Sequence, residues 1–237
     1  YKNYAIIKLN RGYLHATRDI DILIPQEDSR RFLRLLRGKG NIHVYSTVEV
    51  KFISDGLLPI DIYFDLNYMG YRFLDPSEII GKKINVSVLD TQISVSSISH
   101  EIAILILHNF FGHRRVDFMD YLFIRKNKSA LYAVANIARE MNWYPLFKAY
   151  CNIIGFLEDL KKRKGLVFPY TIPLRMFAGY ILRMREISAF NKFSYLLYTS
   201  TFDEIINIWR RRIMRHHDKL GIMTLTYEVP EPEDIDN

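Results

Sequence analysis

Three acidic residues stand where their carboxylates could do chemistry together. Asp19 and Asp21 are two positions apart in the stretch Asp-Ile-Asp-Ile-Leu-Ile-Pro, where polar and apolar residues alternate as in a half-buried strand. Residues two apart on a strand point to the same face, so these carboxylates lie side by side. Such a pair repels, and a divalent cation bound through oxygen ligands removes the conflict. The spacing therefore predicts a site for Mg²⁺ or Mn²⁺.

The third acidic residue, Asp61, follows about forty positions later in Pro-Ile-Asp-Ile-Tyr-Phe-Asp-Leu. This stretch predicts a strand with four apolar side chains on the face opposite Asp61, namely Ile60, Ile62, Phe64 and Leu66. If the two strands are neighbours, the three carboxylates converge, and Asp61 can help to hold a metal or accept a proton from a hydroxyl. With a metal-bound triphosphate, this arrangement serves in-line nucleotidyl transfer. The alternative is an acidic strand edge facing solvent, because Asp-x-Asp is common by chance.

The periodicity of the chain changes from strand-like to helical near residue 97. Before it, the pattern predicts an amphipathic helix at 27–37, strands at 42–46, 48–54 and 59–66, and extended segments within 86–96. After it, helices are expected at 97–111, 116–125, 130–141, 145–162, 173–186 and 203–217. The sequence thus predicts an α+β fold with an α/β domain over 1–97, a helical domain over 98–227 and an acidic, Pro-rich tail over 228–237.

Composition and charge narrow the classes of partner. The 237 residues include 33 Lys and Arg against 26 Asp and Glu, a net charge of +7 that favours polyanions such as RNA, DNA or nucleotide phosphates. Cys151 is the single cysteine, so no disulfide forms within the chain. No apolar run approaches the roughly 18 residues of a membrane helix, and no signal peptide is visible, so a soluble cytoplasmic protein without membrane contact is expected. Because the chain begins at Tyr1, some native N-terminal sequence is expected to be absent.

The stretch around the acidic pair resembles a known family. Ala-Thr-Arg-Asp-Ile-Asp-Ile-Leu-Ile, at 16–24, is similar to the signature of the minimal and abortive-infection-type (AbiEii-like) nucleotidyltransferases of the DNA polymerase β superfamily. In order, the matching residues are Gly12, Thr17, Asp19, Asp21 and Asp61. The resemblance implies a nucleotidyltransferase-type mixed sheet with flanking helices, followed by a helical C-terminal domain.

A second segment, at 100–124, resembles the helix-loop-helix that follows the sheet in AbiEii-like proteins. There a basic residue and an Asp precede a second Asp three positions later, a pattern matched by Arg115, Asp117 and Asp120. The resemblance implies phosphate or nucleotide contacts for Arg114, Arg115 and Asp117, and also for Arg18. Alternatively, the two aspartates stabilise a helix N-terminus through a favourable interaction with the helix dipole, and the arginines form a solvated basic loop.

One part of the family pattern is missing. The family carries a Gly-Gly or Gly-Ser pair upstream, on the element that cradles the triphosphate, whereas this chain has Tyr4 and Ala5 at that spacing. Three explanations of the missing glycine pair are open. The pair lies in absent sequence, the nucleotide is held differently, or activity is lost.

The family resemblance implies transfer of a nucleoside monophosphate from an NTP to an acceptor. Asp19 and Asp21 would bind Mg²⁺ or Mn²⁺, and Asp61 would complete the metal site and act as base. The net positive charge favours RNA, such as a tRNA end, as the acceptor, while a protein or a small molecule such as an aminoglycoside stays open. The resemblance also implies a toxin–antitoxin context with an antitoxin partner.

Two other functions remain open from the sequence. A catalytically inactive module that binds nucleotide or RNA is compatible with the missing Gly pair. Arg211 and His216 have the Arg-x4-His spacing of the metal-independent ribonuclease motif in HEPN helical domains, although a solvated or RNA-contacting basic face would produce the same spacing. Basic residues also cluster at 30–37 and 161–164, where they could form a rim that contacts phosphates.

Overall fold

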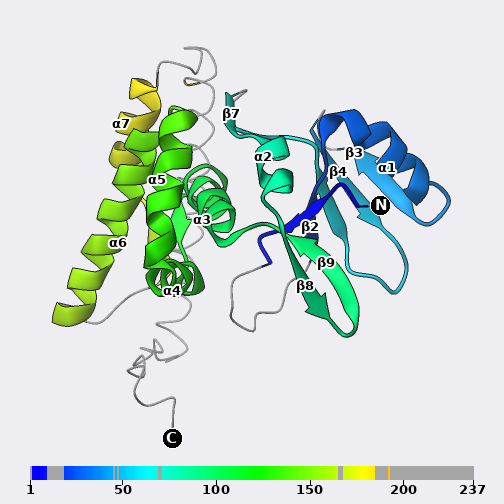
Figure 1. Cartoon of the computed structure of the whole chain (residues 1–237). Helices are drawn as coiled ribbons and strands as arrows, with labels where there is room; N and C mark the ends of the chain where they lie inside the picture. The colour runs from blue at the N-terminus through cyan, green and yellow to red at the C-terminus, as the bar shows by residue number, and fades with distance from the viewer. Residues whose placement is uncertain are drawn as a thin grey trace, which may run out of the picture.

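The computed structural model describes residues 2–9, 19–44, 46, 48–68, 71–164, 168–184 and 192, with the side chains of 113, 161–164 and 174–176 outside this description. Within these residues, a mixed sheet flanked by helices is followed by a group of helices (Figure 1). The predicted α+β fold class, a mixed sheet with flanking helices followed by a helical part, is confirmed.

The main sheet contains seven strands of the described chain, in the order β3-β4-β5-β2-β1-β9-β8. Their bounds are β1 (Ala5–Ile7), β2 (Ile20–Leu23), β3 (Asn41–Val44), β4 (Glu49–Ile53), β5 (Ile60–Tyr63), β8 (Ile84–Val88) and β9 (Thr91–Val95). β2 pairs with β5 in parallel, and β1 pairs with β9 in parallel, while the other neighbours are antiparallel. The two segments with acidic residues are therefore direct neighbours at the centre of the sheet.

Helix α1 (Ser29–Leu36) covers one face of this sheet. A 3-10 turn over Gln26–Asp28 leads into it, and its apolar residues Phe32, Leu33 and Leu36 pack against a buried cluster from the strands. That cluster consists of Ile24, Val50, Phe52, Ile62 and Phe64. The other side of α1 carries only exposed residues, including its arginines. The helix thus follows the amphipathic pattern of its sequence.

The remaining helices lie on the side of the sheet away from α1 (Figure 1). They are α2 (Pro76–Gly81), α3 (Ile98–Leu107), α4 (Phe118–Lys126), α5 (Leu131–Glu140), α6 (Tyr144–Lys164) and α7 (Leu174–Arg183), with a π-helical turn over His108–His113. Two small ribbons join them, β6 (Leu66–Tyr68) with β7 (Tyr71–Leu74), and β10 (Arg115–Val116) with β11 (Tyr170–Thr171). Among the described residues, no helix has both the length and the apolar character to cross a bilayer.

A second buried cluster connects the sheet to these helices. It includes Ala5 and Leu23 from the sheet, Ile104 from α3 and Phe177 from α7. The last strand of the sheet ends at Val95 and α3 begins at Ile98, close to the predicted boundary. The division of the chain into separate domains at residue 97 stays a prediction.

The strand predicted over 59–66 is shorter than expected. β5 ends at Tyr63, and Leu66 begins the β6–β7 hairpin and packs in the helical-side cluster, not with Ile62. The Asp65 carboxylate explains the change of direction, because it accepts hydrogen bonds from the Leu66 backbone N–H and from Arg72 Nε, both at 2.9 Å. A buried carboxylate with these partners turns the chain away from the sheet.

Several helix bounds also differ from the sequence prediction. α3 ends at Leu107 and gives way to the π-helical turn, while Val116 belongs to β10 and α4 begins only at Phe118. The pairing of β10 with β11 is a long-range contact that helical periodicity cannot reveal. The helix predicted at 203–217 and the tail lie outside the described residues.

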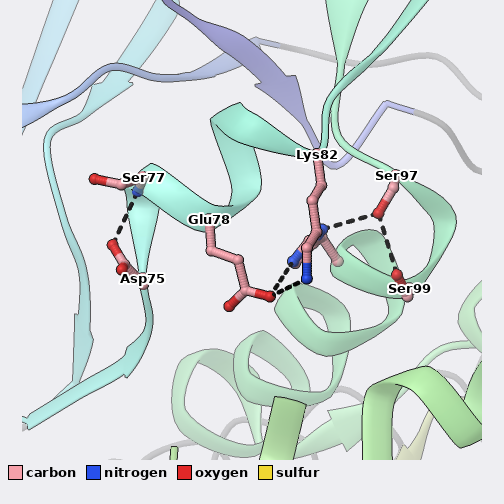
Figure 2. A network of polar contacts seen from close by, with 7 residues as sticks. Asp75, Ser77, Glu78, Lys82, Ser97 and Ser99 are labelled. Atoms are coloured by element: carbon pink, nitrogen blue, oxygen red, sulfur yellow. Dashed lines mark hydrogen bonds and ion pairs between the residues drawn. The ribbon is translucent and has the colours of Figure 1, made fainter. Parts of the chain in front are cut away.

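Helix α2 is joined to the start of α3 by a chain of polar contacts (Figure 2). The Glu78 carboxylate lies 2.6 Å from Lys82 Nζ and 3.8 Å from Nε2 of His100, and His100 Nδ1 is 2.8 Å from Ser97 Oγ. The His100 side chain is buried, and its Nε2 makes no hydrogen bond with any of the described residues. Burial lowers the pKa of His100, Lys82 lowers it further, and Glu78 opposes both.

We predict that this histidine makes the fold sensitive to mild acid. Because its pKa in the folded state lies below the ordinary histidine value of 6.5, the unfolded chain binds more protons there, and stability falls as pH drops below that value. His100→Asn, which keeps a polar group near Ser97, should lose less stability than the wild type between pH 7.5 and 5.5 (about the window set by the ordinary His pKa). Chemical denaturation at several pH values measures this difference, and parallel pH profiles for the two proteins would contradict the prediction.

Candidate functional site

The acidic residues of β2 and β5 meet across a parallel strand pair. Asp21 and Asp61 are Cα partners in this pairing, and Lys51 of β4 is in turn the Cα partner of Asp61. Side chains of directly opposed residues lie on the same face of a sheet. Lys51, Asp61 and Asp21 therefore form one row across three adjacent strands, on the face opposite the cluster that α1 covers.

Asp19 completes the acidic group from the residue just before β2. Burial raises the pKa of its carboxyl, and the negative charges of Asp21 and Asp61 raise it further, together with a side-chain hydrogen bond to Asp61. Lys51 acts in the opposite direction. These influences act over short distances, so the three carboxyls predicted from the sequence lie close together. Their catalytic and metal-binding roles stay predictions.

Two lysines neutralise part of this negative charge. Lys8, at the end of β1, places its Nζ 2.7 Å from Asp21 Oδ1, and Lys51 places its Nζ 3.0 Å from Asp61 Oδ1. All four side chains are mostly shielded from solvent, with exposed fractions of 17% and 12% in the first pair and 23% and 11% in the second. In such surroundings charge pairs interact more strongly than on an open surface.

Glu49 and Tyr63 extend the polar row by one position. They are Cα partners on β4 and β5. Burial raises the pKa of Glu49, followed by the charge of Asp61, and burial also raises the pKa of Tyr63, followed by the charge of Asp21. A fourth carboxyl and a phenol thus face the same acidic group. The sequence offered little to find them, because their place depends on the register between β4 and β5.

The chemistry of the oxygen donors fits a hard divalent cation. The Asp61 carboxylate is 8% exposed, and its Oδ1 lies 3.0 Å from Lys51 Nζ. Carboxylate oxygens suit Mg²⁺ or Mn²⁺, which usually take one or two carboxylates together with waters and phosphates. Among the described residues, no three His, Cys, Asp or Glu side chains are already arranged around a common metal position. Asp19, Asp21 and Asp61 are the residues that would hold the ion.

The second predicted segment has its contacts within the helical part. Arg114 is buried, with a left-handed backbone at φ 49, and its Nη2 donates to the Ile172 carbonyl at 3.3 Å. Its own carbonyl accepts from the Ile172 N–H at 2.7 Å, and its guanidinium lies 5.4 Å from the ring centre of Phe177. These contacts join the loop before α4 to the segment before α7. The predicted phosphate contact of Arg114 stays a prediction.

Arg115 and Asp117 form a half-buried ion pair at the start of α4. Arg115 Nε lies 3.2 Å from Asp117 Oδ1, and Asp117 is the N-cap residue, with Asp120 buried in the first turn of the helix. Acidic groups at this end of a helix are stabilised by its dipole. This is the structural alternative that the sequence left open, and the nucleotide-binding role of these residues stays a prediction. Gly12, Thr17, Arg18, Arg211 and His216 lie outside the described residues.

Comparisons with known proteins give few matches. No model of a known protein family matches this chain, and no curated protein does. Among solved structures, one that is similar is the lincosamide antibiotic adenylyltransferase LnuA in its lincomycin-bound form, with a TM-score of 0.36 and 17% identity. The match covers 54% of this chain and 86% of that one.

We predict that the acidic group strains the fold when no metal is bound. Because the folded state raises the pKa of Asp19, its ionised form is disfavoured relative to the unfolded chain, and stability declines as pH rises through that pKa. Asp19→Asn should therefore raise the melting temperature in EDTA at neutral pH, by a few degrees at most. Calorimetry measures the shift. The same substitution at Asp55, an exposed turn residue, is the control and should change little. A lower melting temperature for Asp19→Asn would contradict the prediction.

Proposed function

We propose that this chain is a nucleotidyltransferase that moves a nucleoside monophosphate from an NTP to an acceptor hydroxyl, using Mg²⁺ or Mn²⁺. The observation that carries the proposal is the direct pairing of Asp21 with Asp61 on parallel strands, with the carboxyl of Asp19 beside both. A bound divalent ion would neutralise phosphate charge as it builds up during transfer.

Each acidic residue has a role in this proposal. Asp19 and Asp21 hold the metal-bound triphosphate, and Asp61 accepts the proton of the attacking hydroxyl. The acceptor oxygen forms a bond to the α-phosphorus, the bond to the β-phosphate oxygen breaks, and pyrophosphate leaves. Asp61 is placed for the proton transfer because its carboxylate lies beside Asp21, one of the two residues assigned to the metal.

Label transfer tests the proposal. The protein is incubated with each α-labelled NTP, Mg²⁺ and total RNA, and Asp61→Asn should lower the transfer rate by about a hundredfold to ten-thousandfold through loss of the base. Asp55→Asn is the matched control and should keep full activity, because Asp55 lies exposed in the turn before β5. Equal transfer by wild type and Asp61→Asn would contradict the proposal. Tight Mg-NTP binding without transfer would instead favour the inactive binding module.

RNA is the acceptor that we propose, and α1 supports it. Arg30, Arg34 and Arg37 recur at helical spacing, with Arg31 and Lys39 beside them, and all five side chains are exposed. Within the described part of the chain none of them pairs with a carboxylate, and Arg34 Nε bonds only the Arg30 carbonyl at 3.3 Å. Cations without protein partners are available to phosphates. We refer to these five residues as the α1 basic stripe.

We predict that the α1 basic stripe contributes to RNA affinity. Changing Arg30, Arg34 and Arg37 to Gln should weaken binding of single-stranded RNA and reduce the slope of log affinity against log salt by about two, since each lost phosphate contact on a single strand changes it by about 0.7. Fluorescence anisotropy over a salt series measures both. The control changes three scattered, exposed lysines to Gln, namely Lys82, Lys128 and Lys148. Equal losses in the two triple variants would contradict the prediction.

The finer assignments belong to the same proposal. The resemblance at 16–24 and 100–124 favours the AbiEii-like group within the DNA polymerase β superfamily, and with it a toxin–antitoxin context and an antitoxin partner. Arg114, Arg115 and Asp117 are proposed to contact the nucleotide, together with Gly12, Thr17 and Arg18. The protein is proposed to act in the cytoplasm.

A further inference from the structure

Each of the two lysines of the site lies beside one carboxylate oxygen of the acidic pair. Lys8 Nζ lies 2.7 Å from Asp21 Oδ1, and Lys51 Nζ lies 3.0 Å from Asp61 Oδ1. They reach the acidic pair from opposite sides, because β1 flanks β2 and β4 flanks β5. The central parallel strands thus supply the negative charges, and the strands beside them supply the positive ones.

Lys8 is fixed by several contacts at once. Its backbone adopts a left-handed conformation at φ 61, which is unfavourable for a residue with a side chain. Its backbone N–H donates to the Glu101 carboxylate of α3 at 2.8 Å, and Glu101 also accepts from Ser96 Oγ. Its ammonium lies 4.9 Å from the ring centre of Tyr63. These contacts direct the side chain toward Asp21.

Lys51 is positioned by the sheet itself. It is the Cα partner of Asp61, while its neighbours Val50 and Phe52 point to the opposite face and are buried there. A slip of one residue in the register would bury the ammonium and expose the apolar residues, so the packing of β4 keeps Lys51 beside Asp61. Lys8 directly follows β1, and Lys51 lies within β4.

Replacing the two lysine ammonium groups with one divalent cation would leave the total charge around the carboxylates unchanged. Two ammonium groups carry the same total charge as one divalent cation, and both sets of charges satisfy the same oxygens of Asp21 and Asp61. A metal that binds these oxygens directly repels the ammonium groups beside them, because like charges so close together interact strongly. Lysine side chains have long, flexible stems that allow such a movement.

We propose that Lys8 and Lys51 are exchangeable counter-ions, which hold the carboxylates together in the metal-free protein and leave them when a divalent cation binds. This inference rests on the proposed function, because it takes Asp21 and Asp61 as metal ligands. It assigns to the two lysines a positioning role that sets the affinity of the site for metal.

Metal binding by the lysine variants tests the inference without any turnover. Mn²⁺ alone is titrated into the full chain and followed by electron paramagnetic resonance. Lys51→Met and Lys8→Met should each bind Mn²⁺ about tenfold more tightly than the wild type, because each variant lacks one ammonium group that competes with the cation for a carboxylate. Lys51→Arg keeps the charge and should resemble the wild type. Lys128→Met is the control, because Lys128 pairs with Glu158 at 2.8 Å outside the site.

Unchanged or weaker Mn²⁺ binding by both Met variants, with the fold intact by circular dichroism, would overturn the inference. If those variants do not fold, the wild type answers the question: Mg²⁺ should shift the side-chain ¹⁵N signals of Lys8 and Lys51 but not that of Lys128, and unshifted signals would overturn it. The proposed function is tested separately by label transfer. If label is transferred but the lysine variants bind Mn²⁺ like the wild type, the proposed function holds and the inference about the lysines fails. If the variants bind Mn²⁺ more tightly but no label is transferred, the metal site holds and the proposed function fails.

Discussion

The parallel pairing of β2 with β5 is the constraint on which the rest of the site depends. It makes Asp21 and Asp61 direct neighbours, although about forty residues separate them in the sequence. The register is held by Ile22 and Ile62, which are also cross-strand partners and lie on the opposite face, where α1 covers them. A shift by one residue would place acidic side chains in that apolar layer, at a cost far above the gain from any new contact.

Holding carboxylates together is unfavourable, and burial and mutual repulsion accordingly raise the pKa of Asp19. Lysines beside the central strands offset part of this cost, because they pair with Asp21 and Asp61. A protein that only needed a stable sheet would do better with apolar or uncharged residues at these positions. A cluster of carboxyl groups with a raised pKa at the centre of a sheet is therefore a candidate functional site.

Local sequence patterns predicted individual strands and helices, but they did not predict how distant segments pair. The alternation around Asp19 and Asp21 identified the acidic strand, and the composition of 27–37 identified α1, because both signals arise within a few residues. Lys8 and Lys51 were missed, because their positions depend on strand order and on the register of β4 against β5. Pattern alone also extended β5 too far, since it could not anticipate the turn made by the Asp65 carboxylate.

The central claim is that three aspartates share one divalent ion, and its most direct test is a crystal structure grown with Mn²⁺ and a non-hydrolysable NTP. We expect an anomalous peak within about 2.0–2.3 Å of oxygens from Asp19, Asp21 and Asp61. We also expect the ammonium groups of Lys8 and Lys51 to have moved off the carboxylate oxygens. Two results would show that the three aspartates do not share a metal ion. One is a nucleotide bound elsewhere, and the other is that Lys8 and Lys51 still pair with Asp21 and Asp61 and no peak lies between the carboxylates.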